Sequence, residues 1–292
     1  MLQQTRAQAV IPYYERFLAR FPTVDALAAA PQDDVLALWA GLGYYSRARN
    51  LWRAARQIAA IGAFPREYGG IRALPGIGDY TAAAIASIAL GLPYAVIDGN
   101  VLRVVARVEN DAADIASART RERFRAIAQS WLPAAQAGAF NQALMELGAT
   151  VCLPRNPLCL VCPLAGCCRA QEEGTAAQLP VKLRKQVPVQ LQRTLLVIRK
   201  GTRILLRKQA EDARHMAGFW DLPTPQEMPL ARPGERLGAF RHTITHHHYT
   251  ITVMAGTSRS ASPAGGWFEA AQLADIPLTT TARKALKLTG IL

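Results

Sequence analysis

A short segment holds four cysteines at the spacing C-x6-C-x2-C-x5-C: Cys152, Cys159, Cys162 and Cys168. Four thiolates this close along the chain can hold a zinc ion or a [4Fe–4S] cluster. Zinc sites more often pair two separated C-x2-C knuckles, whereas a single run with prolines between its cysteines suits a loop folded around a larger cluster. Stabilising disulfides usually join distant segments, so this clustering disfavours them. The spacing therefore predicts a [4Fe–4S] site, with Cys167 as a bystander.

A glycine turn, Leu74-Pro75-Gly76-Ile77-Gly78, lies between two predicted helices. Two glycines let the chain turn tightly and bring backbone N–H groups toward an external oxyanion, and the N-terminus of the next helix adds its dipole. A helix–hairpin–helix grips a DNA phosphate in this way without reading the base sequence. The alternative is a plain turn between two helices.

Asp98 follows the apolar pair Val96-Ile97 and lies where the next helix is predicted to begin. The simplest interpretation is an N-cap, because an aspartate is a good residue at that position. Capping and catalysis are compatible, since a capping carboxylate stays ionised. An ionised carboxylate beside an extruded nucleoside would stabilise a positively charged sugar. Asp98 alone does not decide between the two roles.

Apolar residues at helical spacing dominate the first half of the chain, and alternating strand patterns follow in the last third. Polar, proline-bearing residues separate the two parts. The pattern predicts a mostly helical domain at 1–170, a linker at 171–192 and a smaller α+β domain at 193–292. A β-hairpin is predicted around 200–202 and a strand at 249–254. Helices are predicted at 8–20, 33–39, 47–61 with Ser46 as the N-cap, 81–90, 101–108, 121–132 and 140–147.

The formal net charge is +13, and arginine supplies most of the excess. Such a surplus favours a polyanionic partner, usually nucleic acid, although a solvated basic surface without a partner is the alternative. The N-terminus shows no basic stretch followed by an apolar run. The longest uncharged stretch, 80–97, is broken by Gly91 and Pro93 and is too short to cross a bilayer. We therefore expect a cytoplasmic, nucleoid-associated monomer that does not bind membranes.

The glycine turn, the V-x-D-G-N-V segment around Asp98 and the cysteine loop together resemble the helix–hairpin–helix DNA glycosylases that carry an iron–sulfur cluster. The endonuclease III branch of that superfamily places a lysine nucleophile where this chain has Tyr80. A lysine amine forms a Schiff base with the sugar and then cuts the strand, which a tyrosine cannot do. The resemblance therefore implies a monofunctional glycosylase and disfavours a glycosylase/lyase.

Two further segments, 1–5 (M-L-Q-Q-T) and 39–51 (W-A-G-L-G-Y-Y-S-R-A-R-N-L), resemble the adenine-specific, MutY-type branch. That branch removes adenine mispaired with 8-oxoguanine or guanine in double-stranded DNA. By this resemblance Asp98 is catalytic, and Tyr80 and Asn100 lie beside the extruded adenine. Extruding a base costs a few kcal/mol, and inserted side chains fill the gap that it leaves.

The resemblance also implies a set of DNA-contacting residues. Gln4 and Tyr44 are expected to insert into the base stack, and Leu42 and Gly43 to line that contact. The full set is Gln3, Gln4, Leu42, Gly43, Tyr44, Arg47, Gly76, Gly78, Gln142, Thr245 and His246.

The C-terminal part resembles the family's Nudix-like module for 8-oxoguanine recognition, because 216–223 matches its G-x-W-x-x-P-like segment. True Nudix hydrolases continue with a glutamate-rich, magnesium-binding helix, but 224–236 holds only Glu227 and Glu235. The module is therefore expected to bind and not to hydrolyse. Segment 240–248 matches the loop with the family's F-S-H motif, here Ile244-Thr245-His246. Its four histidines also suggest a metal site, although no carboxylate or cysteine joins them.

The family protonates adenine with a glutamate two residues before the M-L-Q-Q-T methionine, a position that precedes Met1. Losing a general acid lowers the rate by about a hundredfold to ten-thousandfold. One expectation is a longer protein that excises adenine. The alternative is a short form that binds damaged DNA without excision. From these 292 residues we expect lesion binding and inefficient excision.

Overall fold

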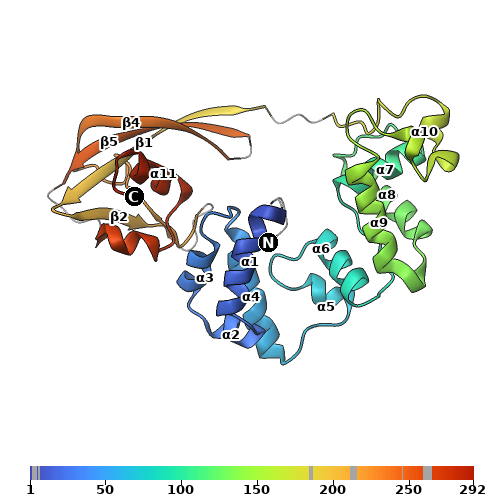
Figure 1. Ribbon diagram of the computed structural model, residues 1–292, viewed down its shortest axis with the longest axis horizontal. Helices are drawn as coiled ribbons and strands as arrows, with labels where there is room; N and C mark the ends of the chain where they lie inside the picture. Colours follow the sequence, from blue (N-terminus) through green and yellow to red (C-terminus); the bar gives the residue numbers. More distant parts are fainter. Residues whose placement is uncertain (2–4, 6, 184–186, 211–215, 245, 259–264) are drawn as a thin grey trace. The chain divides into compact units, whose positions relative to one another are not determined.

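The computed structural model describes residues 1, 5, 7–183, 187–210, 216–244, 246–258 and 265–292. The chain divides into two compact units, one made of Met1–Gly62 with Gln186–Leu292 and the other of Ala63–Lys185. Figure 1 colours the chain from the N-terminus in blue to the C-terminus in red. The domain boundaries at 170 and 192 stay a prediction, since these units follow contacts and divide the helical part at residue 62.

The first unit begins with four helices: α1 Ala7–Arg20, α2 Val24–Ala29, α3 Gln32–Trp39 and α4 Ser46–Ile61. The three longer helices match the predicted ranges. The six-residue α2 was not predicted, because it is too short to show a periodic pattern; Thr23 caps it by accepting a hydrogen bond from the Ala26 amide. The prediction that Ser46 caps the third helix was wrong. Ser46 is the first helical residue, and Tyr45 occupies the cap position without a side-chain cap bond.

A mixed sheet forms the rest of this unit, with strand order β3-β2-β1-β5-β4 and β6 beside β2. The predicted hairpin is confirmed, with Lys200 opposite Arg203 and Gly201 in the left-handed region at the turn. β1 runs parallel to β5, and β4 runs antiparallel to β5. Helix α11 (Thr280–Leu288) packs its apolar face onto the sheet. The strands are β1 Val189–Lys200, β2 Arg203–Lys208, β3 Trp220–Asp221, β4 Arg232–Ile244, β5 His247–Thr257 and β6 Gly265–Phe268.

The second unit is helical, and its core is formed where α7 packs against α8 and α9. The predicted helix at 81–90 is present as α6 followed by a π-helical turn, η1, a local geometry that is frequent at functional sites. The short helix α5 was not predicted. No helix among the described residues is long and apolar enough to cross a membrane. The elements are α5 Tyr68–Arg72, α6 Asp79–Ala84, η1 Ile85–Ala89, α7 Gly99–Val108, α8 Ala118–Trp131, η2 Ala134–Gln136, α9 Ala137–Thr150, η3 Cys159–Val161, η4 Ala165–Cys167 and α10 Arg169–Glu172.

Candidate catalytic site and cysteine loop

Asp98 is the N-cap of α7, as its sequence position indicates. One carboxylate oxygen, Oδ1, accepts a hydrogen bond of 2.7 Å from the Val101 amide. The other, Oδ2, accepts one of 3.1 Å from Nδ2 of Asn100. Both oxygens thus accept N–H groups, as an ionised carboxylate does, and the side chain is fixed at the start of a helix whose dipole favours negative charge.

Tyr80, the second residue of α6, lies within electrostatic reach of Asp98. Burial raises the pKa of the Tyr80 phenol, and the Asp98 carboxylate raises it further. The phenol therefore stays neutral near pH 7, where it can donate a hydrogen bond. Its hydroxyl lies 3.8 Å from Sδ of Met145 on α9. The structure thus adds Met145 to the site, a residue that the sequence pattern indicated only as part of an apolar helix face.

A chain of hydrogen bonds leads from Asp98 to the cysteine loop. Oδ1 of Asn100 accepts a bond of 2.9 Å from Nη2 of Arg103. The same Arg103 donates to the carbonyl of Gly148 at 2.6 Å and, through Nε, to the carbonyl of Cys152 at 2.6 Å. Because Arg103 is only 7% exposed, few competing water contacts are available to it. The residues around Asp98 are therefore positioned by the same side chain that holds the first predicted cysteine ligand.

Gly148→Ala is expected to displace Asn100, because an added Cβ would lie 2.6 Å from the Cβ of Asn100 and 3.0 Å from its Cα. Overpacking a buried contact costs about 1–3 kcal/mol. The free energy of unfolding, measured with denaturant, should fall by about this amount. Gly166→Ala is the control, since a Cβ added there meets no atom within 4 Å. Equal stabilities for the two variants would mean that α7 and α9 do not pack this closely.

The four predicted cluster ligands line one small pocket together with Arg107, and Cys167 lies outside that lining and is exposed. No disulfide joins the five cysteines. Within the described ranges, no three Cys, His, Asp or Glu side chains are grouped closely enough to share one metal ion. Which metal group the four thiols would hold stays a prediction at this point.

Arg107 lies on α7, one turn beyond Arg103, and one of its N–H groups has room for a further hydrogen-bond acceptor. Its side chain is 2% exposed. It donates to Sγ of Cys152 at 3.2 Å, to the carbonyl of Leu153 at 2.8 Å and to the carbonyl of Leu179 at 3.0 Å. Its Nη2 is buried and finds no hydrogen-bond partner among the described residues. A buried N–H group without a partner is costly, and the sulfur atoms of an anionic cluster would accept from it.

The glycine turn before α6 is held by an arginine and an aspartate. Gly76 has a φ of 77°, which favours glycine, whereas Gly78 has an ordinary extended backbone. Arg72 donates to the carbonyl of Ile77 at 2.9 Å and to the carboxylate of Asp79 at 2.6 Å. The hydrogen bond from Arg72 holds the pKa of Asp79 below its ordinary value. The structure thus accounts for the turn, and phosphate binding by it stays a prediction.

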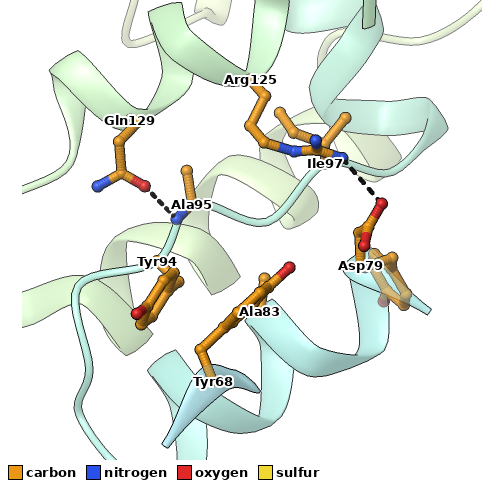
Figure 2. Close-up of a pocket in the computed structure, with 9 residues that line it drawn as sticks. Tyr68, Asp79, Ala83, Tyr94, Ala95, Ile97, Arg125 and Gln129 are labelled. Atoms are coloured by element: carbon orange, nitrogen blue, oxygen red, sulfur yellow. Dashed lines mark hydrogen bonds and ion pairs between the residues drawn. The ribbon is translucent and has the colours of Figure 1, made fainter. Parts of the chain in front are cut away.

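Tyr80 also lines a second small pocket. Figure 2 shows this pocket with most of its lining residues labelled. Two of its walls are the stacked rings of Tyr68 and Tyr94, whose centroids are 4.4 Å apart. Arg125 lies 3.6 Å from the carboxylate of Asp79. Asp98 is not among the residues that line this pocket. Tyr80 therefore lines this pocket, but the candidate catalytic carboxylate of Asp98 does not.

In the first unit, Tyr44 projects from the turn between α3 and α4 and is 50% exposed. Its φ of 50° is unusual for a residue with a side chain. The guanidinium of Arg47 lies 5.4 Å from the centroid of the Tyr44 ring and donates to the carbonyl of Gly43 at 3.1 Å. Leu42, in contrast, is buried in the core. Tyr44 is therefore exposed to solvent, and Arg47 holds the turn beside it through the Gly43 carbonyl. Leu42 is buried below the surface.

The structure describes two of the remaining predicted DNA contacts, Gln142 and His246. Gln142 is exposed on α9 and donates to the carbonyl of Gly138 in its own helix at 3.2 Å. His246 lies before β5, with its ring 4.0 Å from that of His247. Gln3, Gln4 and Thr245 lie outside the described residues. Their roles in DNA binding stay predictions.

Glu227, one of two glutamates in the segment where a Nudix hydrolase would bind magnesium, is already engaged. It forms an ion pair with Arg207, and its other oxygen accepts hydrogen bonds of 3.0 Å from the amide and the hydroxyl of Thr224. The described residues 222–231 form turns and no helix. This part of the module therefore lacks the helical frame on which hydrolases present their metal-binding glutamates.

Comparison with known proteins agrees with this architecture. The model of HhH-GPD superfamily base excision DNA repair proteins matches residues 1–132, and that of the NUDIX domain matches residues 193–288. The chain is 47% identical to the adenine DNA glycosylase of Homo sapiens over 182 residues, which cover 61% of this chain and 33% of the human protein. It is 31% identical to the adenine DNA glycosylase of Mus musculus over 358 residues, covering 99% of this chain and 70% of the mouse protein.

Among solved structures, a thermostable thymine-DNA glycosylase is similar, with a TM-score of 0.53 and 27% identity, covering 59% of this chain and 80% of that chain. The chain spans one third of the length of the human relative that it matches.

Proposed function

The chain belongs to the adenine DNA glycosylase family, and on that premise we propose that it hydrolyses the N-glycosidic bond of adenine mispaired with 8-oxoguanine or guanine in double-stranded DNA. The observation that carries the proposal is the fixed carboxylate of Asp98, which caps α7 and lies within electrostatic reach of Tyr80. The net charge of +13 supports a polyanionic substrate.

In the proposed reaction the bond between C1′ of the sugar and N9 of adenine breaks, and its electron pair leaves with the base. The sugar becomes positively charged, and the Asp98 carboxylate stabilises that charge. A water oxygen then adds to C1′, and the proton that it releases passes to the departing adenine or to solvent. Asn100 holds one oxygen of the carboxylate in place, and the neutral phenol of Tyr80, which lies within electrostatic reach of Asp98, can donate a hydrogen bond.

Because Tyr80 carries no amine, the product is an intact strand with an abasic site. The experiment is incubation of an end-labelled A:8-oxoguanine duplex with a protein that carries these 292 residues. We expect strand breaks only after alkali, which cleaves abasic sites. Breaks without alkali, together with efficient borohydride trapping of a protein–DNA adduct, would show a lyase and contradict the proposal.

We propose that Cys152, Cys159, Cys162 and Cys168 hold a [4Fe–4S] cluster. The shared pocket of the four thiols and the unpartnered N–H of Arg107 support this assignment. When bound, the cluster would supply four strong metal–thiolate bonds that fold the loop. The chain's own part is to present the thiols: Cys159 begins η3, and the other three ligands lie in the turns that follow α9, η3 and η4.

We expect the purified protein to be brown, with absorbance near about 400 nm and about four irons per chain. Cys159→Ser should lose most of the iron, because it removes one of four ligands. Cys167→Ser is the control and should keep it, since Cys167 is exposed and does not line the pocket. A colourless protein with one zinc per chain would overturn the assignment.

We propose that the module at 193–292 binds the 8-oxoguanine side of the mispair and does not hydrolyse pyrophosphates. The turns at 222–231 and the occupied carboxylate of Glu227 support this view. Contact with the lesion is assigned to Thr245 and His246, which lie between β4 and β5 in the sequence.

A further inference from the structure

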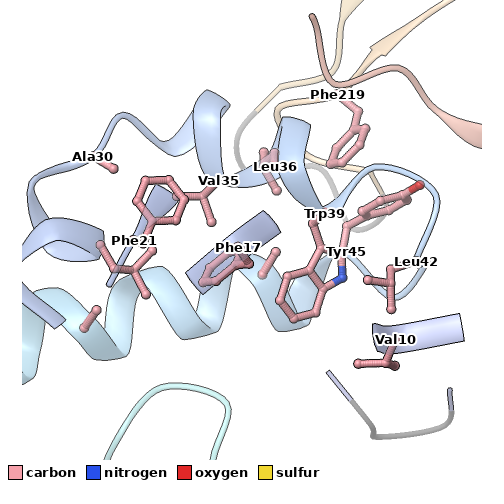
Figure 3. Close-up of a cluster of buried hydrophobic side chains, with 13 residues drawn as sticks. Val10, Phe17, Phe21, Ala30, Val35, Leu36, Trp39, Leu42, Tyr45 and Phe219 are labelled. Carbon is pink, nitrogen blue, oxygen red and sulfur yellow. The ribbon is translucent and has the colours of Figure 1, made fainter. Parts of the chain in front are cut away.

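Phe219 belongs to the C-terminal module, yet it is buried in the core of the N-terminal helices (Figure 3). Its exposure is 0%, and it shares a cluster with Leu36, Trp39 and Tyr45. No other residue of the cluster's buried set, within the described chain, comes from beyond residue 55. The C-terminal module therefore contributes one buried side chain to the core of the N-terminal helices.

The backbone at Gly218 and Phe219 is hydrogen-bonded to Gln209, the residue after β2. The amide of Gly218 donates to the carbonyl of Gln209 at 3.1 Å, and the amide of Gln209 donates to the carbonyl of Phe219 at 2.8 Å. Gly218 has a φ of 78°, and an added Cβ would meet Leu36 at 3.3 Å. The residue after β2 thus holds Gly218 and Phe219, and the glycine allows this backbone to approach α3 closely.

Phe219 contacts Tyr45, the last residue of the turn at 41–45, which we call the wedge turn. The two ring centroids are 4.1 Å apart. The hydroxyl of Tyr45 accepts a hydrogen bond of 3.2 Å from the amide of Gly41, so this side chain joins the two ends of the turn. The same hydroxyl lies 3.3 Å from Oγ1 of Thr280, the first residue of α11. Two residues of the module therefore hold the side chain that closes the wedge turn.

Tyr44 directly precedes Tyr45. Its ring is exposed, and its backbone is in the left-handed region. Such a conformation persists only where the surroundings determine it. Here the carbonyl of Gly43 accepts from Nε1 of Trp39 at 3.2 Å and from Arg47 at 3.1 Å, while Tyr45 fixes the other side. The backbone on both sides of Tyr44 is therefore held, on one side at Gly43 and on the other by Tyr45, whose ring contacts Phe219.

Two polar contacts lie near the contact of Phe219 with Tyr45, but they contribute less to the attachment of the module to the helices. Arg49 donates to the carbonyl of Ala217 at 3.1 Å. Lys208 pairs with Asp33 at 2.6 Å, and both side chains are more than a third exposed, so water screens the pair. The buried aromatic contact is therefore the main element that connects the module to the wedge turn.

We propose that Phe219, assisted by Thr280, is a positioning residue that fixes Tyr44 for insertion into the base stack. The inference rests on the proposed function, because insertion matters only if the protein binds a mispair. It gives the C-terminal module a second role: besides contacting the lesion, it pre-organises a DNA-contacting turn built by other helices. Pre-organised side chains raise affinity because less freedom is lost on binding.

The first test needs no DNA. Hydrogen–deuterium exchange of a protein that carries these 292 residues should show protection at the amides of Gly41 and Leu42, which donate to the Tyr45 hydroxyl and to the carbonyl of Trp39. Phe219→Ala should speed exchange there by about tenfold, and Phe219→Leu should restore most of the protection. The matched control is Phe268→Ala, which removes an aromatic side chain packed against Trp220 inside the module. Exchange in the wedge turn that is unchanged by Phe219→Ala, in a protein that stays folded, would overturn the proposal.

The second test asks whether Phe219 acts through Tyr44. Binding is measured with an A:8-oxoguanine duplex that carries a non-cleavable adenosine analogue. Tyr44→Ala and Phe219→Ala should each raise Kd by about tenfold, and the double variant should bind no worse than Tyr44→Ala alone. If the two increases in Kd multiplied in the double variant, Phe219 would not act through Tyr44. A wild-type protein with no preference for the mispair would instead reject the proposed function, while the exchange experiment would still decide the role of Phe219.

Discussion

Asp98→Asn is expected to lower the single-turnover rate of adenine release by about a hundredfold to a thousandfold and to leave DNA binding nearly unchanged. Asparagine is as good an N-cap as aspartate, so its oxygen can still accept the Val101 amide and α7 should keep its start. What is lost is the negative charge beside the sugar. The measurement is base release under enzyme excess, with duplex binding followed in parallel.

The control is Asp114→Asn, which removes one carboxylate from the same unit at a site where its oxygen accepts the Ala116 amide. That variant should release adenine at the wild-type rate. A second readout follows from the raised pKa of Tyr80. Because the Asp98 carboxylate is one of its causes, the pKa of Tyr80 should fall in Asp98→Asn, in the direction of an ordinary tyrosine. Undiminished adenine release by Asp98→Asn would remove Asp98 from the mechanism.

Arg107→Leu is expected to lower the free energy of unfolding by about 3 kcal/mol or more and to release the proposed cluster. The substitution leaves the carbonyls of Leu153, which is half-buried, and of Leu179, which is buried, without this donor, and a buried group without a partner costs about 1–3 kcal/mol. It also removes the donor to Cys152 Sγ. Denaturant unfolding and iron content per chain measure the two effects.

Arg169→Leu is the matched control, because Arg169 directly follows Cys168 but is 64% exposed and pairs with Glu109. An exposed ion pair contributes about 0–1 kcal/mol, so this variant should keep its iron and nearly all of its stability. If Arg107→Leu retained full iron and wild-type stability, the cysteine loop would not depend on α7.

Local patterns predicted the features that depend on neighbouring residues. Helical periodicity placed α1, α4 and α9 within a few residues, and the Lys200-Gly201-Thr202 turn predicted a hairpin that the structure confirms. Asp98 was expected at a helix start because an aspartate before an apolar helix face is a good cap, and the structure places it there.

Features that depend on distant packing were not predictable in the same way. Arg103 and Arg107 occupy a helix whose charged residues would ordinarily face solvent, but both are buried where α7 approaches the cysteine loop. Phe219 belongs to a segment that resembles a Nudix-like module, and nothing local indicates that its ring enters the core of other helices. Such contacts follow from the tertiary arrangement, which periodicity does not encode.

The most direct measurement is single-turnover base release from two duplexes that differ only opposite the adenine, one with 8-oxoguanine and one with thymine. A protein that carries these 292 residues should release adenine from the A:8-oxoguanine duplex, however slowly, and not from the A:T duplex. Asp98→Asn should lower that release by about a hundredfold to a thousandfold. No adenine release from the mispair, or equal release from both duplexes, would contradict an adenine glycosylase that acts through Asp98.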